Sequence, residues 1–278
     1  MSAKLLDGRG LAAARARELA VRVEGLRAEG ITPRLVVLIS EAGRKGAYFR
    51  AKERIGARIG VAVEGIPFPH AGGLKETMER LSSDPSVSGI MVEAPLPPGI
   101  DPVAIRETLP PAKDVDCGGT VALGRLLCGE PAFPPATAEA VIALLTGHRI
   151  DPAGKNVIIV GRSLVVGRPL ALLFLDRDAT VTVCHSKTKD LAAHTRDADI
   201  VCVAAGRPRL ITGSMIRPGA VVVDVGTNRS PSGLVGDVDP ESVASVAGWL
   251  SPVPGGVGPL TTTILMEHVV AAAERLNR

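Results

Sequence analysis

Residues 157–175 read VIIVGRSLVVGRPLALLFL, an apolar β-branched run that ends at Gly161 and gives way to a helical pattern from about Gly167. Glycine permits a sharp turn after a buried strand, and a second glycine permits close approach at the start of the next helix. Amide N–H groups and the helix dipole then face an anion such as a diphosphate. The stretch therefore predicts a dinucleotide-binding β-turn-α unit. The glycine spacing alone supports an alternative equally well, in which Gly161 and Gly167 only shape the turn between strand and helix.

Strands and helices alternate on both sides of this stretch. Buried strands are predicted at 34–40, 61–68, 89–94, 156–160, 180–184, 199–204 and 220–225, and helices at 10–30, 47–59, 74–82, 133–148 and 258–276. This alternation is typical of parallel sheets covered by helices on both faces. A chain of 278 residues is long enough for two compact lobes. We predict an α/β protein with two α/β lobes around a cleft, the second a Rossmann-type domain with a parallel sheet.

Composition excludes several function classes. A net charge of +3 and the lack of lysine-rich runs with aromatics argue against a nucleic-acid partner. The four cysteines lie far apart without C-x-x-C spacing, so neither a metal site nor a disulfide framework is indicated. No apolar run approaches the ~20 residues that cross a bilayer, and the N-terminus shows no targeting segment. We expect a cytoplasmic protein with no membrane association and no metal.

The residues around the predicted turn favour NADP over NAD. The guanidinium of Arg162 offers a planar fork for a phosphate, and Ser186 and Lys187 follow the next strand, TVTVC. In dinucleotide folds an acidic residue at the end of that strand marks NAD, because it binds the ribose hydroxyls. Here the place is taken by His185, Ser186 and Lys187.

Along essentially its whole length the chain resembles the methylenetetrahydrofolate dehydrogenase/cyclohydrolases. The resemblance rests on GKNVIIVGRSLVVGRPLA (154–171), CHSKT (184–188), GAVVVDVGTNR (219–229), LVGDVD (234–239) and PVPGGVGPLT (252–261). It implies a folate-binding catalytic domain over 1–136, completed by a C-terminal helix over 261–278, and an NADP-binding domain over 137–260. It also implies a homodimer that acts in one-carbon metabolism and purine biosynthesis.

The resemblance assigns residues to cofactor and substrate. The implied NADP-binding residues are Gly161, Arg162, Ser163, Gly167, Ser186, Thr227 and Thr137. Thr227 departs mildly from the family, in which isoleucine is more usual. In PVPGGVGPLT, Gly255 and Gly256 would let the backbone pass close to the folate, and Thr261 opens the last helix. A plain Pro/Gly connector between lobes is compatible with that assignment.

Two motifs in the first lobe carry the implied catalytic residues. In GAYFRAKERIG (46–56), Tyr48 and Lys52 are spaced i, i+4 and share one helix face. Taken alone, such residues are usually a packing tyrosine and a surface lysine. The resemblance instead implies that Tyr48 stacks on the aminobenzoyl ring and that Lys52 serves proton transfer. In PAKDVDCGG (111–119), Asp116 would accept hydrogen bonds from the pterin, with a loop Asx-turn as the alternative.

The substrate side departs from the family pattern. GIMVEAPLP has Glu93 where glutamine is expected, followed by Ala94 instead of leucine. PATAEA (135–140) keeps Thr137 but lacks the cysteine, proline and glycine of the family's P-C-T-P-x-G. Ala122 replaces an expected asparagine, and Lys45 stands where a small polar residue is usual. Glu93 is the expected orienting partner of Lys52, so its charge bears directly on catalysis.

The resemblance implies NADP-dependent oxidation of methylenetetrahydrofolate, followed by hydrolysis of the methenyl product to formyltetrahydrofolate. The departures leave three alternatives: a dehydrogenase with weak or lost cyclohydrolase activity, a shikimate-dehydrogenase-like NADP oxidoreductase with another substrate, and a non-catalytic cofactor-binding paralogue. Retention of Tyr48, Lys52 and Asp116 argues against the last two.

Overall fold

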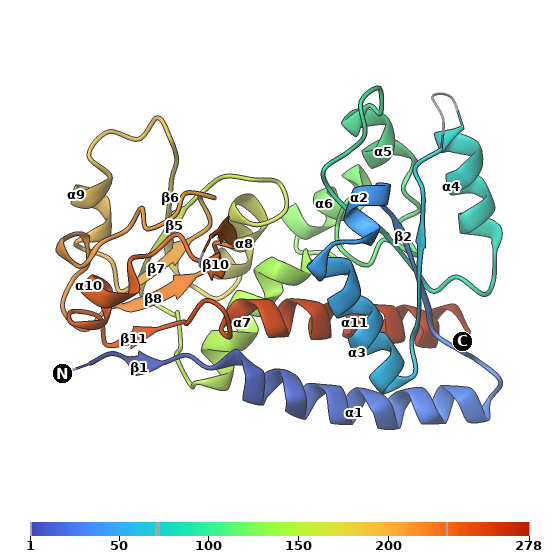
Figure 1. The fold of residues 1–278 in the computed structure, drawn as a ribbon, viewed down its shortest axis with the longest axis horizontal. Helices are drawn as coiled ribbons and strands as arrows, with labels where there is room; N and C mark the ends of the chain where they lie inside the picture. Colours follow the sequence, from blue (N-terminus) through green and yellow to red (C-terminus); the bar gives the residue numbers. More distant parts are fainter. Residues whose placement is uncertain (1, 70–72, 232, 278) are drawn as a thin grey trace. The chain divides into compact units, whose positions relative to one another are not determined.

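The computed structural model describes residues 2–69, 73–231 and 233–277, which form two compact units (Figure 1). One unit comprises Met1–Ala12 and Thr137–Thr261, and the other comprises Ala13–Ala136 and Thr262–Arg278. They are called below the six-stranded unit and the three-stranded unit, after their main sheets. Both are α/β with parallel sheets, as the alternating sequence pattern predicts.

The sheet of the six-stranded unit has the order β1-β11-β8-β7-β5-β6, and every neighbouring pair is parallel. Its strands are β1 (Lys4–Leu5), β5 (Asn156–Val160), β6 (Thr180–Cys184), β7 (Ile200–Val203), β8 (Val221–Asp224) and β11 (Trp249–Leu250). Its smaller elements are α8 (Gly167–Leu175), α9 (Leu191–Thr195), the 3-10 helix η1 (Gly213–Met215), α10 (Pro240–Ala244) and an antiparallel hairpin of β9 (Asn228–Ser230) and β10 (Gly233–Val235).

The opening stretch of sequence forms the centre of this sheet. In β5, Ile158 pairs with Thr182 of β6 on one side and with Val201 of β7 on the other. The β-branched side chains of β5 are buried, which is what a parallel strand covered on both faces requires. Helix α8 then begins at Gly167, and Pro169 is tolerated because it lies in the first turn, where a backbone N–H has no intrahelical acceptor.

The three-stranded unit has a parallel sheet of order β3-β2-β4. Its elements are β2 (Arg34–Leu38), α2 (Glu41–Arg44), α3 (Ala47–Ile59), β3 (Ala62–Ile66), α4 (Leu74–Ser83), β4 (Gly89–Val92), α5 (Pro102–Thr108) and α6 (Thr120–Leu127). The core includes Val36, Leu38, Met78, Leu81 and Ile90. Helix α3 ends at Gly60, whose φ of 88° is a left-handed conformation that glycine adopts freely.

Three helices run in sequence from one unit into the other: α1 (Gly8–Ala28), α7 (Ala136–Gly147) and α11 (Val257–Leu276). The sequence placed residues 1–12 with the folate-binding lobe, whereas the structure groups them with the six-stranded unit. The reason is that β1 adds to the sheet, with Lys4 paired to Trp249 and Leu5 to Leu250. Among the described residues, no helix is both long and apolar enough to cross a membrane.

Candidate active site

Helix α3 buries the side chain of Lys52 in the three-stranded unit. Phe49, Lys52, Gly56 and Ile59 recur at helical spacing and form the buried face of this helix. Gly56 lets the helix lie close to β3, because a Cβ there would come within 2.6 Å of Val63 Cγ2. A lysine on such a face must have a partner, since burying an unpaired ammonium is costly.

Lys52 meets two of the predicted residues. Its Nζ donates to Glu93 Oε2 at 2.5 Å and lies 3.2 Å from the centroid of the Tyr48 ring. Glu93 follows β4 directly, and its backbone N–H continues the sheet by donating to Leu38 O. The i, i+4 spacing therefore places Tyr48 and Lys52 together, and the end of β4 supplies the carboxylate.

Burial and pairing act on Lys52 in opposite directions. Desolvation lowers the pKa of Lys52, whereas the hydrogen bond and the charge of Glu93, together with the charge of Asp116, raise it. The net direction is downward. This pair therefore combines a buried lysine, whose pKa is lowered by desolvation, with a carboxylate that opposes the loss of its proton.

Asp116 completes the cluster of predicted catalytic residues. The backbone N–H of Ala136, the first residue of α7, donates to Asp116 Oδ1 at 2.8 Å. Burial raises the pKa of Asp116 to about 6, although the Ala136 hydrogen bond and the charges of His268 and Lys52 lower it. The donor is a backbone group, so alanine in place of the family's cysteine at position 136 leaves this hydrogen bond in place.

Tyr48 joins the cluster while keeping 39% of its surface exposed. Desolvation of its hydroxyl, followed by the charges of Asp116 and Glu93, raises the pKa of Tyr48, so the phenol stays protonated. One side of the ring contacts the Lys52 ammonium. The exposed remainder leaves the ring available to a flat ligand, as the predicted stacking role requires.

Three residues stabilise the loop that carries Asp116 by hydrogen bonds, and none of them was among the site residues predicted from the sequence. Lys113 Nζ donates to the carbonyls of Leu81 and Asp84. The carboxylate of Asp114 accepts from the backbone N–H groups of Gly118 and Gly119, at 2.9 and 2.8 Å. His268 Nδ1 lies 2.8 Å from Val115 O. Lys113 and Asp114 stand inside the KDVD motif, but nothing in the sequence links His268 of α11 to this loop.

In the six-stranded unit, the turn after β5 has the form expected of a dinucleotide site. Gly161 has a φ of 134°, and a Cβ there would lie 2.2 Å from Ala204 O. A Cβ on Gly167 would lie 2.1 Å from Gly161 O. Both glycines are therefore required for the backbone to pack this closely. The start of α8 is left facing the carboxyl edge of the sheet, where open α/β sheets bind ligands.

Polar side chains lie at this edge. Arg162 and Ser163 in the turn, Ser186 after β6 and Thr227 after β8 are all exposed. Ser163 Oγ accepts from the N–H groups of Val166 and Gly167, which leaves its own proton to donate. Residues 185–187 present no carboxylate that would repel a phosphate. This glycine cradle with an exposed arginine fits a phosphorylated dinucleotide.

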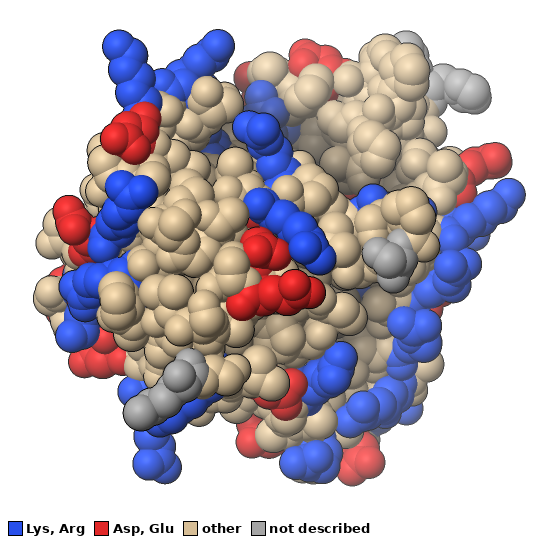
Figure 2. Space-filling model, turned by 60° about the vertical axis from the view of Figure 1, so that its left-hand side comes forward, with Lys and Arg blue, Asp and Glu red and all other residues tan. Residues whose placement is uncertain are grey.

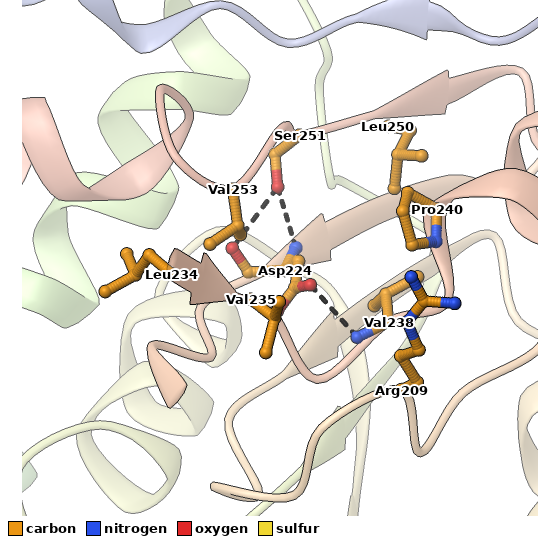
Figure 3. A pocket seen from close by; sticks show the side chains of 10 residues that line it. Arg209, Asp224, Leu234, Val235, Val238, Pro240, Leu250, Ser251 and Val253 are labelled. Carbon is orange, nitrogen blue, oxygen red and sulfur yellow. Dashed lines mark hydrogen bonds between the residues drawn. The ribbon is translucent and has the colours of Figure 1, made fainter. Parts of the chain in front are cut away.

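Two aspartates, Asp224 and Asp237, are buried and stabilise the segment around Thr227 by accepting backbone hydrogen bonds. Asp224 Oδ1 accepts from the N–H groups of Gly226 and Asp237, and Oδ2 accepts from Val238. Figure 3 shows Asp224 between Val238 and Ser251, whose Oγ accepts from the Asp224 backbone N–H. Asp237 in turn accepts from the backbone of Ala205 and Gly206. Burial raises the pKa of Asp224 to about 6.

The remaining predicted residues have packing contacts of their own. Gly255 and Gly256 are buried beside the start of α1, and a Cβ on Gly8 would lie 1.9 Å from Gly256 O. Thr261 is buried within α11, where its hydroxyl donates to Val257 O. Thr137 is the second residue of α7 and is half-buried. These contacts are compatible with ligand roles, which remain predictions for all four residues.

The distribution of charged and possible metal-binding side chains can be followed on the surface and within the described residues. On the face drawn in Figure 2, basic and acidic side chains are interspersed over a largely uncharged surface. Within the described ranges, no group of three or more His, Cys, Asp or Glu side chains is placed to hold a metal ion. Around Lys52, the interacting titratable side chains of the three-stranded unit are Glu93, Tyr48 and Asp116.

Comparison with known proteins assigns the family. The model of the tetrahydrofolate dehydrogenase/cyclohydrolase catalytic domain matches residues 6–116, and the model of its NAD(P)-binding domain matches residues 135–277. A relative from Parafrankia sp., named bifunctional protein FolD, is 48% identical over 276 residues, which cover 97% of this chain and 99% of that protein.

Solved structures agree with this assignment. The bifunctional enzyme FolD, a methylenetetrahydrofolate dehydrogenase/cyclohydrolase from Campylobacter jejuni, superposes with a TM-score of 0.94 at 38% identity and covers 99% of both chains. The Trypanosoma brucei dehydrogenase-cyclohydrolase, solved with NADP and an inhibitor, gives a TM-score of 0.93 at 36% identity, covering 100% of this chain and 99% of that one. The protein therefore belongs to the tetrahydrofolate dehydrogenase/cyclohydrolase family.

Proposed function

We propose that the protein oxidises methylenetetrahydrofolate to methenyltetrahydrofolate with NADP and hydrolyses the product to formyltetrahydrofolate. The observation that carries this proposal is the buried Lys52–Glu93 pair, with Tyr48 and Asp116 beside it, in a chain that also has the glycine cradle at Gly161. The family assignment supports the same activity and favours none of the alternatives. The direct test is reduction of NADP by the purified protein with methylenetetrahydrofolate as substrate.

Binding and orientation are the main requirements of the oxidation step. Bound NADP supplies the hydride acceptor. The Asp116 carboxylate would accept hydrogen bonds from the amino and ring N–H groups of the pterin, and the exposed ring of Tyr48 would stack on the aminobenzoyl group. Gly161, Gly167 and Ser163 would hold the diphosphate, and Arg162 and Ser186 the adenosine 2′-phosphate.

The hydrolysis step needs proton transfer, which Lys52 would provide. In its neutral form, Lys52 Nζ would take a proton from the water that adds to the methenyl carbon. The resulting ammonium would return a proton to the ring nitrogen as its C–N bond opens, and the second water proton leaves to solvent. Glu93 would orient the amine through the 2.5 Å contact. We propose further that the enzyme works as a cytoplasmic homodimer that supplies purine biosynthesis.

Arg162→Ala should raise the KM for NADP about 10- to 100-fold, because one or more charge-assisted hydrogen bonds to the 2′-phosphate, worth about 1.5–3 kcal/mol, are lost. The KM for NAD, which lacks that phosphate, should change little. Steady-state kinetics with both cofactors measure the difference. Arg177→Ala is a matched control, since Arg177 is exposed and follows the other end of α8. Equal losses for both cofactors would place Arg162 on the diphosphate instead.

Glu93→Gln should raise the ratio of cyclohydrolase to dehydrogenase turnover, most clearly near neutral pH. Removing the carboxylate removes the interactions that raise the pKa of Lys52, so more of the lysine is neutral and able to act as a base. The amide can still orient the amine by a hydrogen bond.

Both turnover numbers are measured on one preparation across the pH range. Glu64→Gln serves as control, because Glu64 pairs with Arg34 at the surface of the same unit. A marked fall in the ratio would show that Glu93 itself is a working base. An unchanged ratio would show that its charge does not govern Lys52.

A further inference from the structure

Asp237 is a buried carboxylate at the predicted cofactor edge, and no step of the proposed reaction uses it. Its side chain is fully buried, and it takes part in no ion pair with any residue that the structure describes. Burying a charge without a counter-ion is costly unless hydrogen bonds replace the lost water. Asp237 accepts three such bonds, and they come from the loops that follow two neighbouring strands, β7 and β8.

One carboxylate oxygen of Asp237 holds the loop after β7. Oδ2 accepts from the backbone N–H groups of Ala205 and Gly206, at 2.6 and 2.8 Å. Gly206 has a φ of 65°, a left-handed conformation that suits glycine, and it is exposed. The two converging N–H groups therefore fix the direction in which this loop leaves the sheet.

The other oxygen holds the segment after β8. Oδ1 accepts from Asn228 Nδ2 at 2.8 Å, and Asn228 directly follows the exposed Thr227. On the other side of Thr227, the backbone N–H of Gly226 donates to Asp224 Oδ1. A Cβ on Gly226 would lie 2.3 Å from Asp237 Cγ, so glycine is required where the backbone passes this close to the carboxylate. Both neighbours of Thr227 are thus held by buried carboxylates.

The strand order indicates which half of a dinucleotide these loops would receive. Strand β5 has β6 on one side and β7 on the other, so the order of the strands reverses between β5 and β7. In such sheets a dinucleotide lies across the point of reversal, with the adenosine ribose at the end of the second strand of the first half, here β6. The loops after β7 and β8 belong to the second half, which corresponds to the nicotinamide side.

We propose that Asp237 is a positioning residue for the nicotinamide half of NADP, because it ties together the two loops that would receive the ring. Being fully buried, it acts through Ala205, Gly206 and Asn228 and not by contact with the cofactor. The inference rests on the proposed function and adds a residue that sets how the hydride acceptor is held. Binding of the adenosine 2′-phosphate, which Arg162 and Ser186 would provide, does not depend on it.

Asp237→Ala should lower dehydrogenase turnover by about 10- to 100-fold, because a small displacement of a reacting group costs that much in rate. Cyclohydrolase turnover on methenyltetrahydrofolate, which needs no hydride acceptor, should change little. Isothermal titration should show a higher Kd for NADP but an unchanged Kd for 2′,5′-ADP, which carries the adenosine 2′-phosphate and no nicotinamide. Asp237→Asn keeps an oxygen for Ala205 and Gly206 and should restore most of the lost turnover.

Asp199→Ala is the matched control in the same sheet. Asp199 precedes β7 at the opposite end of the strand, where it accepts from the backbone N–H of Asn156 at 2.8 Å and pairs with Arg217. Its loss should cost stability without a selective fall in dehydrogenase turnover. Thermal unfolding shows whether each variant is folded. Asn228→Ala removes only the side-chain donor to Asp237 Oδ1, so a smaller selective loss in this variant tests the proposal even where Asp237→Ala does not fold.

Equal loss of both activities in a folded Asp237→Ala protein, or loss of 2′,5′-ADP binding in step with NADP, would show a purely structural role and overturn the proposal. Unchanged dehydrogenase turnover would overturn it too, as would an Asp237→Asn protein no more active than Asp237→Ala or an equal selective loss in Asp199→Ala. An unmodified protein that does not reduce NADP with folate would contradict the proposed function instead. The ratio of the two Kd values then still decides the inference.

Discussion

Lys52→Met should reduce cyclohydrolase turnover by about 10²- to 10⁴-fold, the usual contribution of a positioned proton-transfer group, and should leave dehydrogenase turnover much less affected. Methionine has a similar length and suits the fully buried site, but it cannot carry a proton. Hydride transfer depends on the placement of folate and nicotinamide, which in the proposed function Tyr48, Asp116 and the glycine cradle would maintain. The two activities should therefore separate in one variant.

Both rates are measured on the same preparation, together with folate binding at equilibrium. Lys75→Met is the control, since Lys75 is an exposed lysine of α4 in the same unit. Some loss of thermal stability is expected, because Glu93 keeps a buried carboxylate without its ammonium partner. If dehydrogenase activity disappears first while folate still binds, Lys52 does not have the role proposed here.

Gly161→Ala should abolish NADP binding and destabilise the protein by roughly 2–6 kcal/mol, the sum of backbone strain and overpacking. The φ of 134° is rarely adopted by residues with a side chain, and the new Cβ would lie 2.2 Å from Ala204 O. Ala204 follows β7, the neighbour of β5, so neither backbone segment can move without disturbing the sheet.

Gly154→Ala is a control that introduces the backbone strain of a left-handed alanine without a steric clash of the new Cβ. Gly154 lies in the same unit with a φ of 68°, but a Cβ there has nothing within 4 Å. It should cost only about 1–2 kcal/mol, the usual penalty of a left-handed residue, and should leave NADP affinity intact. Thermal unfolding and NADP titration compare the two variants. A Gly161→Ala protein that binds NADP normally would refute the role of this turn.

The longer helices and strands were predictable because their apolar residues follow clear helical or strand patterns. The β-branched run at 156–160 and the α3 pattern gave the same bounds in the structure, Asn156–Val160 and Ala47–Ile59. The two-residue strands β1 and β11 could not be found, because they are too short to show a period and exist only by pairing with each other and with β8. That pairing also explains why residues 1–12 group with the six-stranded unit.

The candidate catalytic cluster was predictable from resemblance, with only partial support from spacing. The i, i+4 rule places Tyr48 with Lys52, but nothing local to residue 93 or residue 116 indicates that either meets Lys52. The hydrogen bonds that stabilise the Asp116 loop were harder still to predict. The Ala136 N–H is a backbone donor, and His268 lies more than 150 residues from the Val115 carbonyl it contacts. Such contacts depend on tertiary packing alone.

The most direct test of the account follows two products as the purified protein reacts with methylenetetrahydrofolate and NADP. Absorbance of NADPH reports the oxidation, and absorbance of the methenyl compound reports its formation and decay. We predict NADPH production with folate, with methenyl product that is consumed as formyltetrahydrofolate forms. A protein that leaves NADP unreduced with folate but reduces it with a hydroxy acid such as shikimate would contradict the central claim.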